Sequence, residues 1–155
     1  MTTRGSKNPE PLRVVFTKSL DLPSKSNLWD CDEAKTIVIY DSCTADESYL
    51  TRIPKCVEVE KVSSDNPELI SKILAKRGCN KVFWECGPRL ATAAIQSNCI
   101  QEIITFIAPK ILGGENSMNP LSDFEFREMN EIIKLSNSQF SLIGDDICVK
   151  SSFKN

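Results

Sequence analysis

The sequence predicts an α/β fold in which a mixed sheet is flanked by helices. Short β-branched and apolar runs recur along the chain, separated by Pro, Gly, Asn, Asp and Ser. Two segments in the middle carry apolar residues at helical spacing, and strand-like runs surround them. Two further strand-like runs close the chain. This order of strand, helix, strand and final strand pair is typical of α/β proteins with a mixed sheet.

The first half is expected to contain three strands. Each is a short run rich in Val, Ile or Thr, and together they cover residues 13–17, 36–40 and 56–60. Residues 19–35 separate the first two, carry Pro23 and many polar side chains, and predict a loop.

The second half begins with a helix signal. Asn66 offers a capping side chain, Pro67 suits a first helical turn, and Gly78 closes a segment whose apolar residues share one face. A strand at 81–85, a Gly-Pro turn and a second helix are expected next. Later strands are predicted at 103–108, at about 129–136 and at about 145–152, with parallel-crossover character only within 66–108.

The composition describes one domain, residues 1–155, and excludes several classes of protein. Of the 155 residues, 41% are hydrophobic, which is enough for a core. Nineteen Lys and Arg against 21 Asp and Glu leave a charge of −2, so we expect no nucleic-acid partner. No apolar stretch approaches the ~20 residues of a bilayer-spanning helix, and the N-terminus lacks a signal-peptide pattern. We therefore expect an intracellular protein with no membrane partner.

The absence of histidine and the spacing of the cysteines narrow the chemistry. With no histidine, an imidazole base, a Ser-His-Asp triad and a zinc deaminase of the H-x-E type are excluded within this chain. The number of cysteines, seven, is odd, and no two of them form a C-x-x-C motif. They lie at positions 31, 43, 56, 79, 86, 99 and 148. We expect free, mostly buried thiols, with no disulfide and no metal.

The sharpest local feature is V-F-W-E-C-G-P-R-L-A-T-A-A at residues 82–94. A strand ending in Glu85 is expected to turn at Gly87-Pro88 into an Ala-rich helix. The helix N-terminus would leave the backbone N–H groups of residues 88–90 free for an anion, and Gly87 would let a ligand approach the backbone. The alternative is an ordinary strand-to-helix turn with Glu85 as a solvated terminus.

The end of the first strand, Thr17-Lys18, holds the analogous position. Lys18 there is a candidate for a ligand phosphate, and the alternative is an ordinary surface lysine.

Residues 82–114, VFWECGPRLATAAIQSNCIQEIITFIAPKILGG, resemble the reductase half of the bifunctional riboflavin-biosynthesis deaminase/reductase. The shared motifs are a strand ending E-x-G-P, L-A at a helix start and a later strand ending A-P-K-hydrophobic-L-G. Matches at Arg13-Val14-Val15 and at Ile143-Gly144-Asp145-Asp146-Ile147 extend the resemblance over about residues 1–150, and E-C-G-P resembles the cyanobacterial and plant branch.

The resemblance implies a dihydrofolate-reductase-like fold, a twisted mixed sheet with flanking helices. It also implies NADPH-dependent reduction of 5-amino-6-(5-phosphoribosylamino)uracil to the ribitylamino compound. The substrate would then be a small phosphoribosylaminopyrimidine and the cofactor NADPH. The location would be the cytoplasm, or the plastid stroma for a plant protein. A homodimer is also expected, because an incomplete sheet exposes a strand edge.

The family's binding residues carry over motif by motif, and no catalytic residue is assigned. For the substrate, the family implies Glu85 from E-x-G-P and Arg4, where T-T-R-G matches its L-T-x-R segment. For the cofactor it implies Thr17 and Lys18, although the family usually has Asp-Ser there. The remaining cofactor residues are those of the turn and helix start, namely Gly87, Pro88, Arg89, Leu90, Ala91, Thr92 and Ala93.

Several family segments do not precede Met1 in this sequence. They include an S-L-D-G loop, an S-D-x-x-D segment and the whole deaminase half. The chain therefore resembles the last two-thirds of a reductase domain, with a sheet incomplete at the N-terminus. We expect such a chain to bind NADPH weakly and to turn over poorly. The alternative function is a catalytically silent dimerisation or nucleotide-binding module derived from that reductase.

Overall fold

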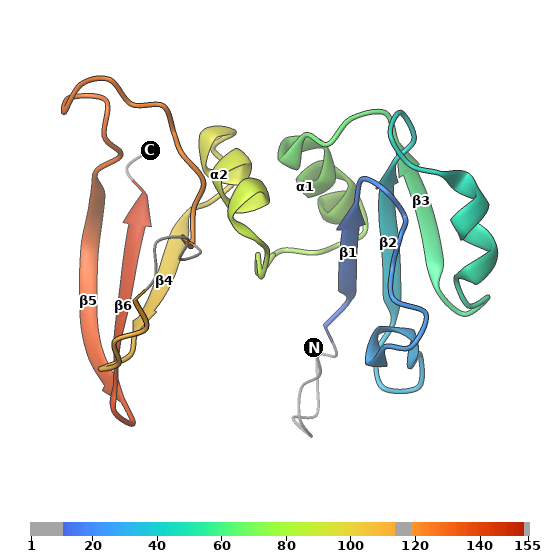
Figure 1. The fold of residues 1–155 in the computed structure, drawn as a ribbon, viewed down its shortest axis with the longest axis horizontal. Coiled ribbons are helices and arrows are strands. Elements are labelled where there is room, and N and C mark those ends of the chain that lie inside the picture. Colours follow the sequence, from blue (N-terminus) through green and yellow to red (C-terminus); the bar gives the residue numbers. More distant parts are fainter. Residues whose placement is uncertain (1–10, 114–118, 154–155) are drawn as a thin grey trace. The chain divides into compact units, whose positions relative to one another are not determined.

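The computed structural model describes residues 11–113 and 119–153, and its strands form two separate ladders (Figure 1). The chain divides into two compact units, Met1–Asp65 and Asn66–Asn155, and each is described by itself. The first unit holds the ladder β1-β2-β3, and the second holds the ladder β4-β6-β5. Within the described ranges, no helix has the length and apolarity to cross a bilayer.

The first ladder is parallel throughout. Strands β1 (Arg13–Thr17), β2 (Thr36–Asp41) and β3 (Glu58–Val62) confirm the three expected runs, the third starting two residues later than predicted. All three point the same way, so the prediction that only 66–108 has parallel-crossover character is wrong. The connecting segments 18–35 and 42–57 exceed the dozen residues that a parallel return needs, although neither contains an α-helix.

Strand β2 is buried on both faces, and one core cluster of this unit lies on the face of Val38 and Tyr40. Leu20, Val38, Tyr40 and Val57 are its buried centre. The cover comes from the loop between β1 and β2, which contains the 3₁₀ turn η1 (Asn27–Trp29), and from the 3₁₀ helix η2 (Glu47–Arg52). Partly buried side chains of both pack on the centre, among them Leu22, Trp29, Cys31, Tyr49, Leu50 and Ile53.

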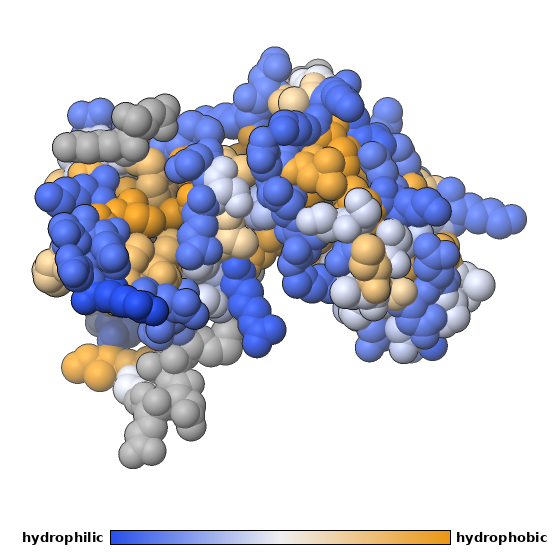
Figure 2. Space-filling view, turned by 90° about the horizontal axis from the view of Figure 1, so that it is seen from above, coloured by the Kyte–Doolittle hydropathy of each residue, from blue (hydrophilic) through white to orange (hydrophobic). Residues whose placement is uncertain are grey.

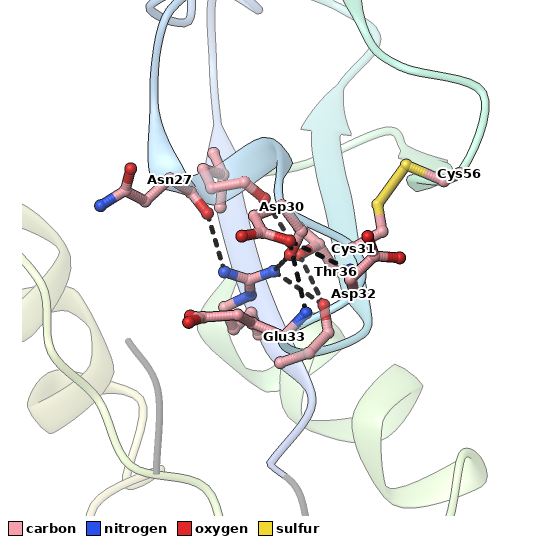
Figure 3. The surroundings of a disulfide bond; sticks show 10 residues. Asn27, Asp30, Cys31, Asp32, Glu33, Thr36 and Cys56 are labelled. Atoms are coloured by element: carbon pink, nitrogen blue, oxygen red, sulfur yellow. Dashed lines mark hydrogen bonds between the residues drawn. A yellow bond between two sulfur atoms is a disulfide. The ribbon is translucent and has the colours of Figure 1, made fainter. Parts of the chain in front are cut away.

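The buried side chain of Arg13 forms hydrogen bonds to the loop between β1 and β2, called the cover loop below. The guanidinium of Arg13 donates to the carbonyl oxygens of Asn27 at 2.9 Å and Ala34 at 2.7 Å, and also to that of Asp30. The Asp30 carboxylate accepts from the next turn, at the amide nitrogens of Asp32 and Glu33 (Figure 3). The loop thus contains no paired strands, and three of its backbone carbonyls bind the guanidinium of Arg13.

A disulfide joins Cys31 to Cys56, so the expectation that every cysteine is a free thiol is wrong (Figure 3). Cys31 lies in the turn ahead of β2, and Cys56 lies directly ahead of β3. Because neighbouring parallel strands begin at the same edge, the two Cα atoms come within 6.3 Å, a distance that a disulfide spans. The other cysteines, Cys43, Cys79, Cys86, Cys99 and Cys148, are free thiols.

The second unit contains both expected helices, α1 (Pro67–Lys76) and α2 (Pro88–Gln96), each with proline in its first turn. The Asn66 side chain caps α1 by accepting from the Glu68 amide at 2.9 Å. Gly78 follows the helix with a φ of 84°, and the Cys79 amide reaches back to the Leu74 carbonyl. This left-handed ending suits glycine, as the sequence indicated.

The second ladder is antiparallel, with β6 (Asp146–Phe153) between β4 (Glu102–Ile107) and β5 (Leu135–Ile143). A two-residue turn at Gly144-Asp145 connects β5 to β6, and Gly144 has a φ of 62°. The expected strand at 129–136 is wrong, because β5 starts only at its end. In a hairpin the two strands pair outward from the turn. The turn and the pairing with β6 therefore determine which residues form β5.

The expected strand at 81–85 is also wrong: this segment joins no ladder in the described part of the chain. Its apolar side chains remain accessible, and Phe83 is 69% exposed. A run of Val, Phe and Trp supplies strand propensity, but a strand also needs a neighbour that accepts and donates its backbone hydrogen bonds.

Candidate functional site

The carboxyl ends of β1, β2 and β3 form the first candidate surface. Parallel strands end at one edge, where open α/β sheets bind ligands. Thr17 ends β1 and Lys18 follows it, Asp41 ends β2, and Asp65 comes shortly after β3. The structure thus gathers polar residues from three distant stretches of sequence along this edge.

Hydrogen bonds connect the turns that follow these strands. The Thr44 hydroxyl lies 2.9 Å from the Lys18 carbonyl and 3.1 Å from the carboxylate of Asp41. Asp41 is buried, and its other carboxylate oxygen accepts from the Cys43 amide at 3.0 Å. The Thr17 hydroxyl accepts from the Leu20 amide at 3.1 Å. The edge is therefore held by side chains as well as by the ladder.

Lys18 carries the positive charge of this edge and forms an ion pair with Asp65. The hydrogen bond from Lys18, followed by its charge, holds the pKa of Asp65 below its ordinary value. The lysine is 62% exposed, so the pair lies in water and contributes little to stability. A phosphate could therefore replace Asp65 as the ion-pair partner of Lys18 at a small cost in free energy.

Thr17 and Lys18 were predicted from the sequence as candidate residues at the end of the first strand, whereas Asp41, Thr44 and Asp65 were not predicted. The available signal was their position, since each lies at or shortly after the end of a strand-like run. Their contacts depend on the parallel pairing of β1, β2 and β3, which was not predicted for this half of the chain.

The N-terminus of α2 is the second candidate surface, and it belongs to the second unit. Gly87 is the N-cap, with an ordinary φ of −70° and no side chain to accept from the helix. Its carbonyl accepts from the Ala91 amide at 3.0 Å, which starts the helix at Pro88. The turn and helix predicted from the sequence are therefore confirmed.

Two backbone donors remain at this N-terminus. The amides of Arg89 and Leu90 have no acceptor in the described part of the chain, whereas Pro88, included in the expected range 88–90, has no N–H. A Cβ built on Gly87 would meet no atom within 4 Å, so space lies open in front of the turn. Two aligned N–H groups at the positive end of a helix dipole suit an anion.

The other predicted residues differ in their surroundings. Glu85 is exposed and makes no hydrogen bond or ion pair with any residue that the structure describes. The Thr92 hydroxyl is buried and engaged with the Ser122 backbone, accepting from its amide at 2.9 Å. Arg4 lies outside the described residues. Burial raises the pKa of the Cys86 thiol, which makes it a poor nucleophile at neutral pH.

Comparison with known proteins gives matches to one family over nearly the whole chain. The family model of the RibD C-terminal domain matches residues 1–149. The chain is 38% identical over 148 residues to the riboflavin biosynthesis protein RibD of Synechocystis, covering 94% of this chain and 40% of that protein. It is 36% identical over 149 residues to the chloroplastic riboflavin biosynthesis protein PYRR of Arabidopsis thaliana, covering 96% of this chain and 25% of that one. The chain thus spans at most two-fifths of these two relatives.

Among solved structures, RibD of Acinetobacter baumannii matches with a TM-score of 0.74 at 19% identity, covering 94% of this chain and 38% of that one. This likeness confirms the predicted mixed α/β fold of the dihydrofolate-reductase type. Family model, relatives and fold agree over nearly the whole length: the chain belongs to the RibD C-terminal domain family.

Proposed function

We propose that this chain is a riboflavin-pathway pyrimidine reductase domain, spanning residues 1–155, that uses NADPH. The observation that carries the proposal is the uncapped N-terminus of α2. Gly87 leaves open space there, and the amides of Arg89 and Leu90 have no acceptor among the described residues. Membership of the RibD C-terminal family supports a reductase role for these donors.

The residues present suit a nicotinamide dinucleotide, which carries a pyrophosphate and, in NADPH, a further phosphate. The amides of Arg89 and Leu90 would hold pyrophosphate oxygens, while the Lys18 ammonium offers a point charge for a phosphate. The family resemblance also assigns to the cofactor the Thr17 hydroxyl of the first unit and the helix residues from Gly87 to Ala93 of the second unit. Bound NADPH supplies the hydride that, with a proton, converts a ribosyl group to an open ribityl chain.

The proposed substrate is 5-amino-6-(5-phosphoribosylamino)uracil, a phosphoribosylaminopyrimidine. Glu85 has no protein partner within the described residues, so its carboxylate is available to accept from the substrate's amino or hydroxyl groups. Arg4 is the proposed second contact, where a guanidinium suits the substrate's phosphate. These groups bind and orient, and no residue is proposed to transfer a proton.

We also propose that two copies of the domain associate through the β4-β6-β5 sheet. Its register places Ile107, Ile147 and Leu142 in one row, and Phe140 lies on the same face. Leu142 is 76% exposed and Phe140 72%, and Figure 2 shows apolar side chains at the surface of the part that carries these strands. Contiguous exposed apolar surface of this kind marks interaction sites.

For the location we propose the plastid stroma if the chain comes from a plant, because the Arabidopsis relative is named chloroplastic, and the cytoplasm otherwise.

The experiment is an NADPH titration by fluorescence or calorimetry with two variants and a matched control. Gly87→Val should weaken NADPH binding by at least about tenfold, because the new side chain occupies the anion's approach. Its thermal midpoint should fall by only about 2–4 °C, since the Cβ meets no protein atom within 4 Å and the φ of −70° suits valine, although valine is a poorer N-cap than glycine.

Lys18→Ala should weaken binding about threefold to tenfold through loss of a phosphate contact. Lys72→Ala is the control: this lysine is also paired with a carboxylate, Glu68, and is similarly exposed, but it lies on α1. Equal affinity of wild type and Gly87→Val would remove the N-terminus of α2 from the site. Tight NADPH binding without reduction of the pyrimidine substrate would support the silent nucleotide-binding module instead.

A further inference from the structure

The Cys31–Cys56 disulfide is accessible from solvent. Cys56 is exposed and Cys31 is half-buried. An incoming thiolate can therefore reach the Cys56 sulfur without unfolding the unit. Compartments that house intracellular metabolic enzymes keep structural thiols reduced, and disulfides found there are usually catalytic or redox-sensing. If the chain works in the stroma or cytoplasm, as proposed above, this bond exchanges between two states.

The bond closes the cover over the core of the first unit. It links the loop around η1 to the segment between η2 and β3, and these two pieces cover the cluster centred on Val38 and Tyr40. Backbone bonds inside the loop are few and local, such as those from the Trp29 amide to the Ser26 carbonyl and from the Leu22 amide to the Leu20 carbonyl. The Arg13 guanidinium and the disulfide hold the loop to the rest of the unit. Smaller contacts add to them: the Thr36 hydroxyl donates to the Leu28 carbonyl at 3.2 Å, and Arg52 forms an exposed ion pair with Asp21.

The same loop begins at the proposed cofactor edge. Leu20 is buried to 2% and has a φ of 60°, a backbone conformation that a leucine adopts only when its surroundings enforce it. Its amide donates to the Thr17 hydroxyl at 3.1 Å, and the neighbouring Lys18 carbonyl accepts from Thr44. A looser cover would release Leu20, and with it the placement of Thr17 and Lys18.

We propose that Cys31–Cys56 is a thiol–disulfide exchange site for a dithiol reductant and that its oxidised form favours dinucleotide binding. A thiolate of the dithiol attacks the Cys56 sulfur and forms a mixed disulfide, and Cys31 leaves as a thiolate that takes up a proton. The second thiol of the reductant then resolves the mixed disulfide and releases Cys56 as a thiol. The dithiol is oxidised to a disulfide, and the protein gains two thiols. The effect on binding rests on the proposed cofactor site, whereas the exchange itself does not.

The first test equilibrates the full chain in buffers of oxidised and reduced dithiothreitol at graded ratios. Alkylation followed by peptide mass spectrometry should find Cys31 and Cys56 modified together as the buffer becomes reducing. Hydrogen exchange should show residues 20–34 losing protection over the same range, because the cover then loses its covalent link to the segment ahead of β3. Free thiols at both positions in the oxidising buffer, or unchanged protection on reduction, would overturn the exchange site.

The second test measures NADPH affinity in both states. Reduction should weaken it about fivefold or more, the scale of a modest coupling between two sites. The double variant Cys31→Ser, Cys56→Ser should match the reduced wild type in either buffer, whereas the control Cys79→Ser should respond like the wild type. Equal affinities in the two states would refute the coupling. Absence of NADPH binding in both states would refute the proposed cofactor site, and alkylation with hydrogen exchange would then decide the exchange site alone.

Discussion

Replacing Arg13 by methionine should remove the inner clamp of the cover loop. Methionine keeps most of the side chain's length and apolar stem but has no donor. The guanidinium is buried and donates to three backbone carbonyls, those of Asn27, Asp30 and Ala34. Its Nε atom has no acceptor, so the buried cation already lacks one hydrogen bond.

The loss in free energy of unfolding depends on which hydrogen bonds each carbonyl oxygen keeps after the substitution. A hydrogen bond from a charged donor contributes about 1.5–3 kcal/mol, so three bonds represent up to about 9 kcal/mol before the cost of burying the cation. That burial costs several kcal/mol, which methionine avoids. The Asn27 carbonyl still accepts from the Asp30 amide at 3.3 Å, and the Ala34 carbonyl from the Thr36 hydroxyl at 3.5 Å. We expect a net loss of about 3 kcal/mol.

Thermal and urea unfolding followed by circular dichroism would measure this loss. For a chain of this length, about 3 kcal/mol lowers the midpoint by about 6–12 °C. Arg52→Met is the matched control, because Arg52 is exposed, lies 4.0 Å from the Asp21 carboxylate and stacks on Tyr49. It should lose less than about 1 kcal/mol. Arg13→Lys should be at least as unstable as Arg13→Met, since an ammonium buries charge without the planar fork. Equal losses in Arg13→Met and Arg52→Met would refute the clamp.

Two further predictions concern the ends of local elements. Asp65→Asn should tighten NADPH binding about twofold to fivefold by freeing Lys18, an effect of the size of a surface ion pair. Because Lys18 lowers the pKa of Asp65, the pair stabilises the fold at neutral pH and this contribution disappears as the pH falls through the lowered pKa. The stability difference between wild type and Asp65→Asn should therefore be present at pH 7 and vanish at the acid end of a melting series. A difference that persists unchanged in acid would contradict it. Asn66→Ala should cost about 1 kcal/mol in urea unfolding by removing the cap of α1, whereas Asn66→Asp should keep most of that stability; equal losses would exclude the cap.

Local signals were sufficient wherever a few neighbouring residues decide the structure. Asn66 and Pro67 start α1, Gly78 ends it, and Gly87-Pro88 starts α2, all as the sequence indicated. In each case the deciding interaction is a bond to a backbone group within a few residues, or a φ angle that one residue type prefers. The candidate anion site at α2 could therefore be located from sequence alone.

Pairing between distant segments was not predictable in the same way. The parallel order of β1, β2 and β3 depends on two connections that carry no helix signal, and the disulfide follows from that order. Counting and spacing of cysteines cannot reveal that Cys31 and Cys56 precede neighbouring strands. The contact of Lys18 with Asp65 was missed for the same reason, because it joins the ends of strands whose neighbours were unknown.

In segment 81–87 a run with strand propensity, which needs a distant partner, is followed by a turn that needs only its own residues. Its residues favour a strand, yet a strand forms only against a partner, and none of the described strands pairs with it. The turn that follows needs no partner, because Gly87 and Pro88 fix the start of α2 by backbone geometry alone. The proposed phosphate site at the helix N-terminus therefore depends on a locally determined structure, whereas the position of Glu85 depends on how its segment is held. On the proposed roles, a change that alters the backbone of segment 81–85 should act on substrate binding more than on NADPH binding.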